Sequence, residues 1–141
     1  MIRVVQSHVV YRFFGDRWTL LIIRQAFLKT CRFDDFQKQL GITRHLLTER
    51  LNRLVEHHIF EKVLYQDAPK RYEYQLTEKG LALYPILMSI SAWGNVWLNE
   101  NKQFKALHYK HQSCGQLIST QPHCAYCQQQ LSAEHILPIY L

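Results

Sequence analysis

Apolar residues recur with a helical period through the first third of the chain. Asp16 is suited to cap a helix whose apolar side chains begin at Trp18, and this segment is apolar enough to be largely buried. A short helix that begins near Phe33 should stop at Gly41, because glycine readily adopts the left-handed backbone that ends a helix. Thr43 can then cap another helix at once.

Two helices joined by so tight a turn form a helix-turn-helix signature. Ile42 and Leu47 occupy the two positions of a hydrophobic staple, which supports the start of the second helix. Many ordinary helical hairpins share this pattern, so the next segment decides its meaning. Residues 59–65 are rich in strand formers, residues 72–76 alternate like a strand, and the polar residues 66–71 between them can turn. A β-hairpin placed directly after the second helix is the arrangement of a wing.

A longer apolar segment follows this hairpin. Thr77 is placed to cap a helix that runs to about Glu100, and Pro85 should kink it or separate its first two turns, because proline lacks a backbone donor. Beyond this helix the sequence becomes rich in His, Gln and Cys, and no internal repeat is visible. We therefore expect a mainly α (α+β) fold, with a winged helix-turn-helix domain over residues 1–101 and a tail over residues 102–141.

The helix expected after the tight turn has two distinct faces. Its leucines and Val55 fall on an apolar side that must face the core, while the opposite side carries short polar groups that both donate and accept hydrogen bonds. Major-groove recognition requires such groups, and base contacts usually come from the N-terminal part of the recognition helix. The predicted DNA-binding residues are His45, Thr48 and Glu49 near base edges, Asn52 and Thr43 beside them, Arg44 and Arg53 on phosphates, and Lys70 and Arg71 at the wing tip.

The charge of the chain adds weight to this interpretation. Lys and Arg outnumber Asp and Glu by 17 to 11, for a formal charge of +6. An amphipathic helix alone could simply be solvated, but a cationic hairpin beside it favours an anionic partner such as double-stranded DNA. Glu49 allows two interpretations, since it could accept from a cytosine amino group or pair with Arg53 one turn later.

Several motifs occur together in the order and spacing of one family. They are GDRWTLLIIR at 15–24, RFDDF at 32–36, LTERL at 47–51, YEYQLTEKG at 72–80 and WG at 93–94. In these motifs the chain resembles the HxlR-type winged-helix regulators, which are MarR-like, over roughly residues 5–98. The resemblance implies a transcription regulator, a repressor that binds a near-palindromic operator as a homodimer. It also implies that the N-terminal segment and the long C-terminal helix form the dimer interface.

The apolar content of the C-terminal helix agrees with such an interface. Its large apolar side chains exceed what one small domain needs, although they could instead fill an intramolecular core. The side chains concerned are Ile86, Leu87, Ile90, Trp93, Val96 and Trp97.

The cysteines of the main domain depart from the pattern of part of this family. Some members carry a reactive cysteine just before the first long helix, where this chain has Val5, Gln6 and Ser7, so that mechanism should be absent. Cys31 lies beside Arg32, whose charge could lower the thiol pKa. A lone cysteine is more often a small apolar filler.

The tail has the spacing of metal ligands. His111 and Cys114 are three positions apart, as are Cys124 and Cys127, so a tight turn at each pair can aim two side chains at one point. Two such pairs supply the four ligands of tetrahedral Zn²⁺, and a tail too small for its own core would gain stability from the metal. We predict a structural, zinc-ribbon-like site.

The tail leaves alternatives open. His108 or His123 could replace His111 as the fourth ligand, and without metal the tail would hold free thiols in a disordered stretch. A redox role for Cys124 and Cys127 would need a helix N-terminus within a βαβ unit, which the pattern does not predict.

Other classes of function fit the sequence less well. No nucleophile elbow, phosphate loop or paired carboxylates occur, so we expect no enzyme. A winged-helix protein-interaction module without DNA binding is the main alternative. Neither a secretory signal nor a run of roughly 20 apolar residues occurs, so we expect a cytoplasmic protein. A small-molecule effector is possible but unidentified.

Overall fold

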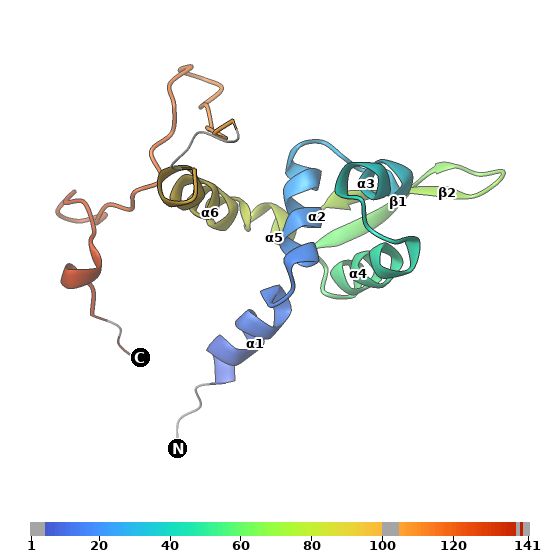
Figure 1. Ribbon diagram of the computed structural model, residues 1–141, viewed down its shortest axis with the longest axis horizontal. Helices are drawn as coiled ribbons and strands as arrows, with labels where there is room; N and C mark the ends of the chain where they lie inside the picture. Colours follow the sequence, from blue (N-terminus) through green and yellow to red (C-terminus); the bar gives the residue numbers. More distant parts are fainter. Residues whose placement is uncertain (1–4, 100–104, 138, 140–141) are drawn as a thin grey trace. The chain divides into compact units, whose positions relative to one another are not determined.

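The computed structural model describes residues 5–99, 105–137 and 139, which fall into two units divided after Tyr84 (Figure 1). The elements are α1 (Val5–Phe14), α2 (Arg17–Phe27), α3 (Phe33–Leu40), α4 (Arg44–Glu56), β1 (Phe60–Gln66), β2 (Arg71–Leu76), α5 (Glu78–Leu81), α6 (Tyr84–Trp97) and the 3-10 turn η1 (Ala133–His135). The predicted domain boundary near residues 101 and 102 lies outside the described residues. None of the described helices is both long and apolar enough to cross a membrane.

The helix caps predicted from the sequence are confirmed. The Asp16 carboxylate accepts backbone N–H bonds from the first turn of α2 at 3.1 Å, and Thr43 Oγ1 accepts the Leu46 N–H at 3.4 Å. Gly41 ends α3 with a φ of +62°, in the left-handed region that glycine adopts without a steric cost. The tight turn between α3 and α4 therefore follows directly from local sequence.

The core of the first unit lies among α2, α3, α4 and the start of the hairpin. Burial of each large apolar side chain in this core contributes roughly 1.5–3 kcal/mol to the free energy of unfolding. Phe36 on α3 faces Phe60 on β1 with 6.2 Å between ring centroids, which joins the helices to the hairpin. The buried apolar residues of this unit are Ile22, Ile23, Phe36, Ile42, Leu47, Leu51, Leu54, Ile59 and Phe60.

The predicted wing is present, with β1 shifted by one residue and β2 one residue longer than predicted. β1 and β2 are antiparallel, with Phe60 opposite Leu76 and Gln66 opposite Arg71. Ile59, predicted in the first strand, precedes it, and Arg71 is the first residue of β2 instead of part of the turn. Sequence alone sets strand ends poorly because the ladder hydrogen bonds, and not the residue types, define them.

The predicted long helix after the wing is interrupted, as the proline indicated. Thr77 Oγ1 accepts the Gly80 N–H at 3.1 Å and caps the short helix α5. A Cβ at Gly80 would collide with the Ile59 carbonyl oxygen, so glycine is required where α5 lies against the chain before β1. Pro85 lies in the first turn of α6, where a missing backbone donor costs nothing.

The second unit begins with α6 and continues into the tail. Asn95 Nδ2 donates to the Leu107 carbonyl oxygen at 2.8 Å, and Asn95 Oδ1 accepts the Leu107 N–H at 3.2 Å. The hydroxyl groups of Ser91 and Tyr109 lie 3.1 Å apart. These bonds hold the beginning of the tail along α6.

The tail contains a structural repeat that is not visible in the sequence. In the first turn (residues 111–115), the His111 N–H donates to the Gln116 carbonyl oxygen at 2.9 Å, and the Gly115 N–H donates to that of His111 at 2.8 Å. A β-bridge between Lys110 and Leu117 encloses this turn.

The second turn (residues 124–128) repeats the same bonds thirteen positions later, with Cys124 in the place of His111. The Cys124 N–H donates to the Gln129 carbonyl oxygen, and the Gln128 N–H donates to that of Cys124, both at 2.9 Å. A β-bridge between His123 and Gln130 encloses it. The repeat is hidden in the sequence because it is made by backbone groups.

Candidate nucleic-acid interface

The outward face of α4 carries the polar residues predicted to read DNA. Leu47, Leu51 and Leu54 are buried on the opposite side, which fixes the rotation of the helix. The predicted two-faced helix is therefore confirmed, except that Leu46 and Val55, which were expected in the core, are only half-buried. The exposed residues at this face are Thr43, Arg44, His45, Thr48, Glu49 and Asn52.

The side chains of this face differ in how far they are already engaged. Thr48 Oγ1 donates to the Arg44 carbonyl oxygen at 2.8 Å, which leaves the hydroxyl oxygen able to accept. Within the described part of the chain, His45 and Asn52 form no side-chain hydrogen bond or ion pair. Their donors and acceptors are therefore free for an incoming ligand.

Glu49 is paired, but not with the predicted partner. Its Oε1 lies 2.7 Å from Arg50 Nη1, so the suggested pair with Arg53 is wrong. Arg50 comes within reach because its Nε donates to Asp16 Oδ1 at 3.0 Å, which draws the guanidinium along the surface of α4. The Glu49 side chain remains 59% exposed and can still accept hydrogen bonds from outside.

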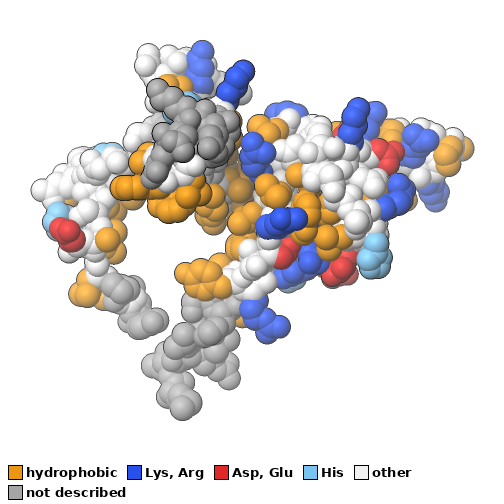
Figure 2. Space-filling view, in the orientation of Figure 1, with side chains coloured by type: hydrophobic (Ala, Val, Ile, Leu, Met, Phe, Trp, Pro, Cys, Tyr) orange, Lys and Arg blue, Asp and Glu red, His pale blue; other side chains and the backbone are white. Residues whose placement is uncertain are grey.

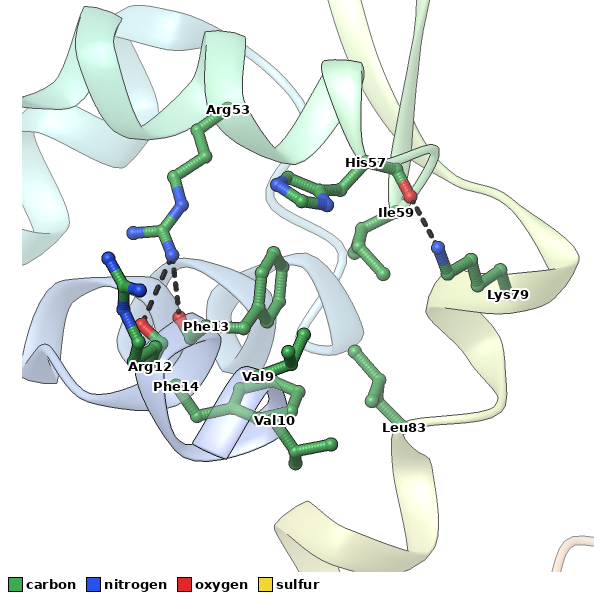
Figure 3. Close-up of a pocket in the computed structure, with 10 residues that line it drawn as sticks. All are labelled: Val9, Val10, Arg12, Phe13, Phe14, Arg53, His57, Ile59, Lys79 and Leu83. Atoms are coloured by element: carbon green, nitrogen blue, oxygen red, sulfur yellow. Dashed lines mark hydrogen bonds between the residues drawn. The ribbon is translucent and has the colours of Figure 1, made fainter. Parts of the chain in front are cut away.

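Arg53 lies apart from the other predicted DNA-binding cations. Its Nη2 donates to the Arg12 carbonyl oxygen at 3.2 Å and to that of Phe13 at 3.4 Å (Figure 3). Its guanidinium also lies 5.2 Å from the centre of the Phe13 ring. Arg53 thus binds the free carbonyl groups at the C-terminus of α1, and its contact with phosphate stays a prediction.

A hollow that we call the α1 pocket lies beside this contact and has a volume of about 550 Å³. Figure 3 shows Phe13 and Phe14 of α1 facing His57, Ile59 and Leu83 across it. The pocket is mainly apolar, with cations at its edge. Its lining residues are Val9, Val10, Arg12, Phe13, Phe14, Arg53, His57, Ile59, Lys79 and Leu83.

The cations of the wing and of α4 meet in a hollow of about 480 Å³, the wing groove. Arg44, at the start of α4, shares it with Lys70 and Arg71 from the hairpin. Figure 2 shows Lys and Arg side chains along the hairpin, at the right of the view. The lining residues are Arg32, Phe33, Asp34, Asp35, Arg44, Tyr65, Lys70, Arg71, Tyr72 and Tyr74.

Two contacts hold Arg44 at the edge of the wing groove. Its Nη1 lies 3.6 Å from Asp34 Oδ1, and its guanidinium lies 4.7 Å from the centre of the Phe33 ring. Both charged side chains are mostly exposed, so this ion pair is weak and easily exchanged for a phosphate contact. These contacts therefore orient Arg44 at the groove but leave its guanidinium able to bind a phosphate.

Arg32 is a residue of this groove that sequence reasoning missed. Its Nε lies 3.1 Å from Glu73 Oε1, and its guanidinium lies 4.6 Å from the centre of the Tyr65 ring. An isolated β-bridge between Arg32 and Glu73 places it there. Nothing local in the sequence pairs these two residues, which are 41 positions apart.

The surroundings of Cys31 favour the filler interpretation over a sensing role. Burial raises the pKa of the Cys31 thiol, and the Glu73 carboxylate raises it further. Arg32 lowers it, but with less effect than burial and Glu73. The thiol therefore stays protonated at neutral pH, whereas a reactive cysteine needs its thiolate.

The predicted metal ligands form two pairs. His111 Nδ1 lies 3.2 Å from Cys114 Sγ in the first turn. In the second turn, the backbone N–H groups of Cys127 and Tyr126 lower the pKa of the Cys124 thiol. Across residues 5–99, 105–137 and 139, no three His, Cys, Asp or Glu side chains are gathered at a metal site.

Comparison with known sequences places the chain among transcription regulators. The model of the HxlR-like helix-turn-helix family matches residues 13–102, more than half of the chain. Mb3122 of Mycobacterium bovis, an uncharacterized HTH-type transcriptional regulator, is 36% identical over 124 residues, which cover 88% of this chain and 78% of that protein. The HTH-type transcriptional regulator YodB of Bacillus subtilis is 33% identical over 82 residues, 57% of this chain and 73% of YodB.

Solved structures of transcription regulators also resemble this chain. PA1607, a candidate transcription factor known from a crystal structure, has 32% sequence identity and a TM-score of 0.79, with coverage of 92% of this chain and 89% of PA1607. The reduced form of YodB from B. subtilis has 28% identity and a TM-score of 0.56, with coverage of 68% of this chain and 95% of YodB.

These findings confirm the winged-helix fold, mainly α with a β wing. Transcription regulators of this kind are not enzymes. In helix-turn-helix proteins the second helix of the motif lies in the major groove of DNA. The chain belongs to the HxlR-like helix-turn-helix family and is a DNA-binding transcription regulator.

Proposed function

We propose that the protein is a repressor that binds a near-palindromic operator as a homodimer. One observation carries the binding mode: the free polar face of α4 lies next to a groove that unites Arg44 with Lys70 and Arg71. A two-fold dimer presents two copies of α4, so its operator has two similar half-sites about one helical turn, or a multiple of it, apart.

In this proposal, α4 enters the major groove and reads bases with its exposed polar side chains. Asn52 has the amide geometry that pairs with adenine, and Glu49 can accept from the amino group of cytosine. His45 and Thr48 lie closer to the N-terminus of α4, where recognition helices approach base edges. Thr43, at the exposed start of α4, lies where the positive end of the helix dipole attracts a phosphate.

The cations of the wing groove supply phosphate contacts. Arg44, Lys70 and Arg71 are all exposed, and their only acidic neighbours lining the described groove are Asp34 and Asp35. Phosphate contacts fix register and orientation on the duplex and carry no sequence information by themselves. This division of roles gives each group of residues its own experimental signature.

The dimer is supported by apolar side chains that one copy of the chain leaves uncovered. On α1, Val9, Val10 and Tyr11 are exposed. On α6, Leu87 is buried, as an intramolecular core would require, but the other five predicted interface residues are exposed: Ile86, Ile90, Trp93, Val96 and Trp97. Exposed apolar surface of this extent marks an interaction site. Both helices therefore belong to the proposed dimer interface.

Selection from genomic DNA tests the proposed operator. The zinc-replete protein is incubated with genomic fragments at near-physiological salt, and the retained fragments are sequenced. A sharply enriched, near-palindromic site is expected. Uniform retention that disappears as salt rises would contradict specific binding. No retention at all would favour the protein-interaction module instead.

Two further measurements separate the parts of the proposal. Sedimentation velocity should show a dimer, and Trp93→Glu on α6 should convert it to a monomer, whereas Lys38→Glu on α3 should not. A reporter gene placed behind the selected operator should lose expression when the protein is present. A dimer that raises expression from that reporter would retain the binding mode and refute repression.

A further inference from the structure

We propose that the tail holds one structural Zn²⁺ ion between its two equivalent turns, with His111, Cys114, Cys124 and Cys127 as ligands. The two turns share a hydrogen-bonding pattern at every backbone position described above. The bonds that flank the turns also match. The Ile118 N–H donates to the Tyr109 carbonyl oxygen and the Leu131 N–H donates to that of Pro122, both at 2.8 Å. The tail is thus a tandem of one backbone unit.

This equivalence selects the fourth ligand, which the sequence left open. Thirteen positions separate equivalent residues, so His111 corresponds to Cys124 and Cys114 corresponds to Cys127. His123 corresponds to Lys110, in the β-bridge outside the turn, and the position equivalent to His108 is Gln121. Only His111 occupies the place that a ligand occupies in the other turn.

The geometry of each turn brings its two donor groups together. His111 Nδ1 and Cys114 Sγ lie 3.2 Å apart, a separation that two ligands of one tetrahedral ion can adopt. The second turn repeats the backbone hydrogen bonds of the first, and there the Cys127 side chain lies beside the Cys124 sulfur. One nitrogen and three sulfur ligands form a set typical of structural zinc.

No described residue of the tail is buried, so this part of the chain has no apolar core of its own. Its apolar side chains are largely uncovered, with Tyr126 99% exposed, Leu137 81% exposed and Leu117 67% exposed. A segment without a buried core needs a cross-link to hold a fold, and a structural metal is one such cross-link.

Zinc would join two turns that the described chain keeps as separate pairs. Nine residues lie between Cys114 and Cys124, so the chain between them can fold back and let both pairs reach one ion. Four protein ligands leave no open coordination position, so the ion is structural and takes part in no reaction.

Metal analysis of the full-length chain tests this inference. The protein is purified, dialysed against metal-free buffer and measured by atomic emission, with one zinc per chain expected. Replacement by Co²⁺ should give the visible bands of a tetrahedral site together with sulfur-to-cobalt charge-transfer bands. Far-ultraviolet circular dichroism confirms that the helical unit stays folded in each variant.

Ligand variants and matched histidine controls decide the ligand set. His111→Ala, Cys114→Ser, Cys124→Ser and Cys127→Ser should each lose the bound ion, while His108→Ala and His123→Ala should keep it. Loss of zinc in His123→Ala but not in His111→Ala would overturn the assignment from the repeat. A zinc-exposed wild-type chain that binds no metal and leaves all its tail thiols reactive would overturn the site itself.

Discussion

Arg50, in the middle of α4, donates from Nε to Oδ1 of Asp16 at 3.0 Å and so ties the recognition helix to the start of α2. Asp16 also caps α2 and accepts a 2.6 Å hydrogen bond from the Thr19 hydroxyl. Burial alone would raise the pKa of Asp16, but the hydrogen bonds from Thr19 and Arg50 and the charge of Arg50 together lower it. One carboxylate therefore sets both a helix start and the position of α4.

Asp16→Asn should lower the free energy of unfolding by about 2 kcal/mol, because it removes charge-assisted hydrogen bonds at a largely covered site. Urea unfolding at pH 7 measures this loss. The stabilisation needs the ionised carboxylate, so it should be complete above the ordinary pKa of 3.8 and disappear as the pH falls through the lower folded value.

Glu49→Gln is the matched control, since Glu49 pairs with the same arginine but is 59% exposed. This substitution should lower the free energy of unfolding by less than about 1 kcal/mol. An equal cost for the two variants at pH 7 would contradict the assigned role of Asp16.

The two groups of proposed DNA contacts should differ in their effect on specificity. Arg71→Ala should weaken binding to all sequences alike and reduce the slope of log affinity against log salt by about 0.9. His45→Ala or Thr48→Ala should instead change which base is preferred, with a loss of about 1–3 kcal/mol of discrimination. Competition binding on operator variants measures both effects.

Lys29→Ala is the control for these variants, because Lys29 is an exposed cation outside α4 and the wing groove. Its salt slope should match the wild type. Unchanged base preference in both the His45 and the Thr48 variant would place the reading surface elsewhere.

Arg53→Gln should loosen the C-terminus of α1. The cation satisfies two carbonyl groups at the end of that helix, an interaction worth about 1 kcal/mol. Amide exchange in the last turn of α1 should therefore become about fivefold faster. Asn52→Ala on the same helix should leave this exchange unchanged. A salt slope lower by about 0.9, with exchange unaffected, would instead support the predicted phosphate contact of Arg53.

Cys31 should react slowly with iodoacetamide at neutral pH, because burial and Glu73 raise its pKa. Glu73→Gln should speed the reaction, since it removes the nearby negative charge and leaves Arg32 to favour the thiolate. Peptide mass spectrometry follows Cys31 separately from the tail cysteines. Glu61→Gln, at an exposed position of β1, should have no effect. A fast wild-type reaction would reopen a sensing role for Cys31.

Gln128→Gly should strengthen zinc binding by the tail, if the proposed site is correct. Gln128 has a φ of +61°, which costs a residue with a side chain about 1 kcal/mol and glycine very little. Zinc affinity in a competition assay should rise about fivefold. The reciprocal variant Gly115→Gln, at the equivalent position of the first turn, should lower it by a similar factor. A change of the same sign in both variants would contradict the equivalence.

Much of the fold was predictable because its signals are local. Asp16, Gly41 and Thr43 mark helix ends within one turn of their hydrogen-bond partners, so nearby residues alone determine them. The burial of Leu47, Leu51 and Leu54 follows from helical spacing, and this identifies the exposed face of α4. The recognition helix and the wing could therefore be assigned without a structure.

Tertiary packing decided which of the predicted residues share a site. It brought Arg44 into one groove with Lys70 and Arg71, and it turned Arg53 toward α1. It also paired Glu49 with Arg50, because the bond from Arg50 to Asp16 draws that arginine along the helix. Arg32 and Glu73 are paired across 41 positions, a separation at which residue type gives no indication of contact. The sequence by itself determined the elements and their faces, since those depend on neighbours along the chain. Only the folded structure decided the contacts between elements, since those depend on how distant segments pack.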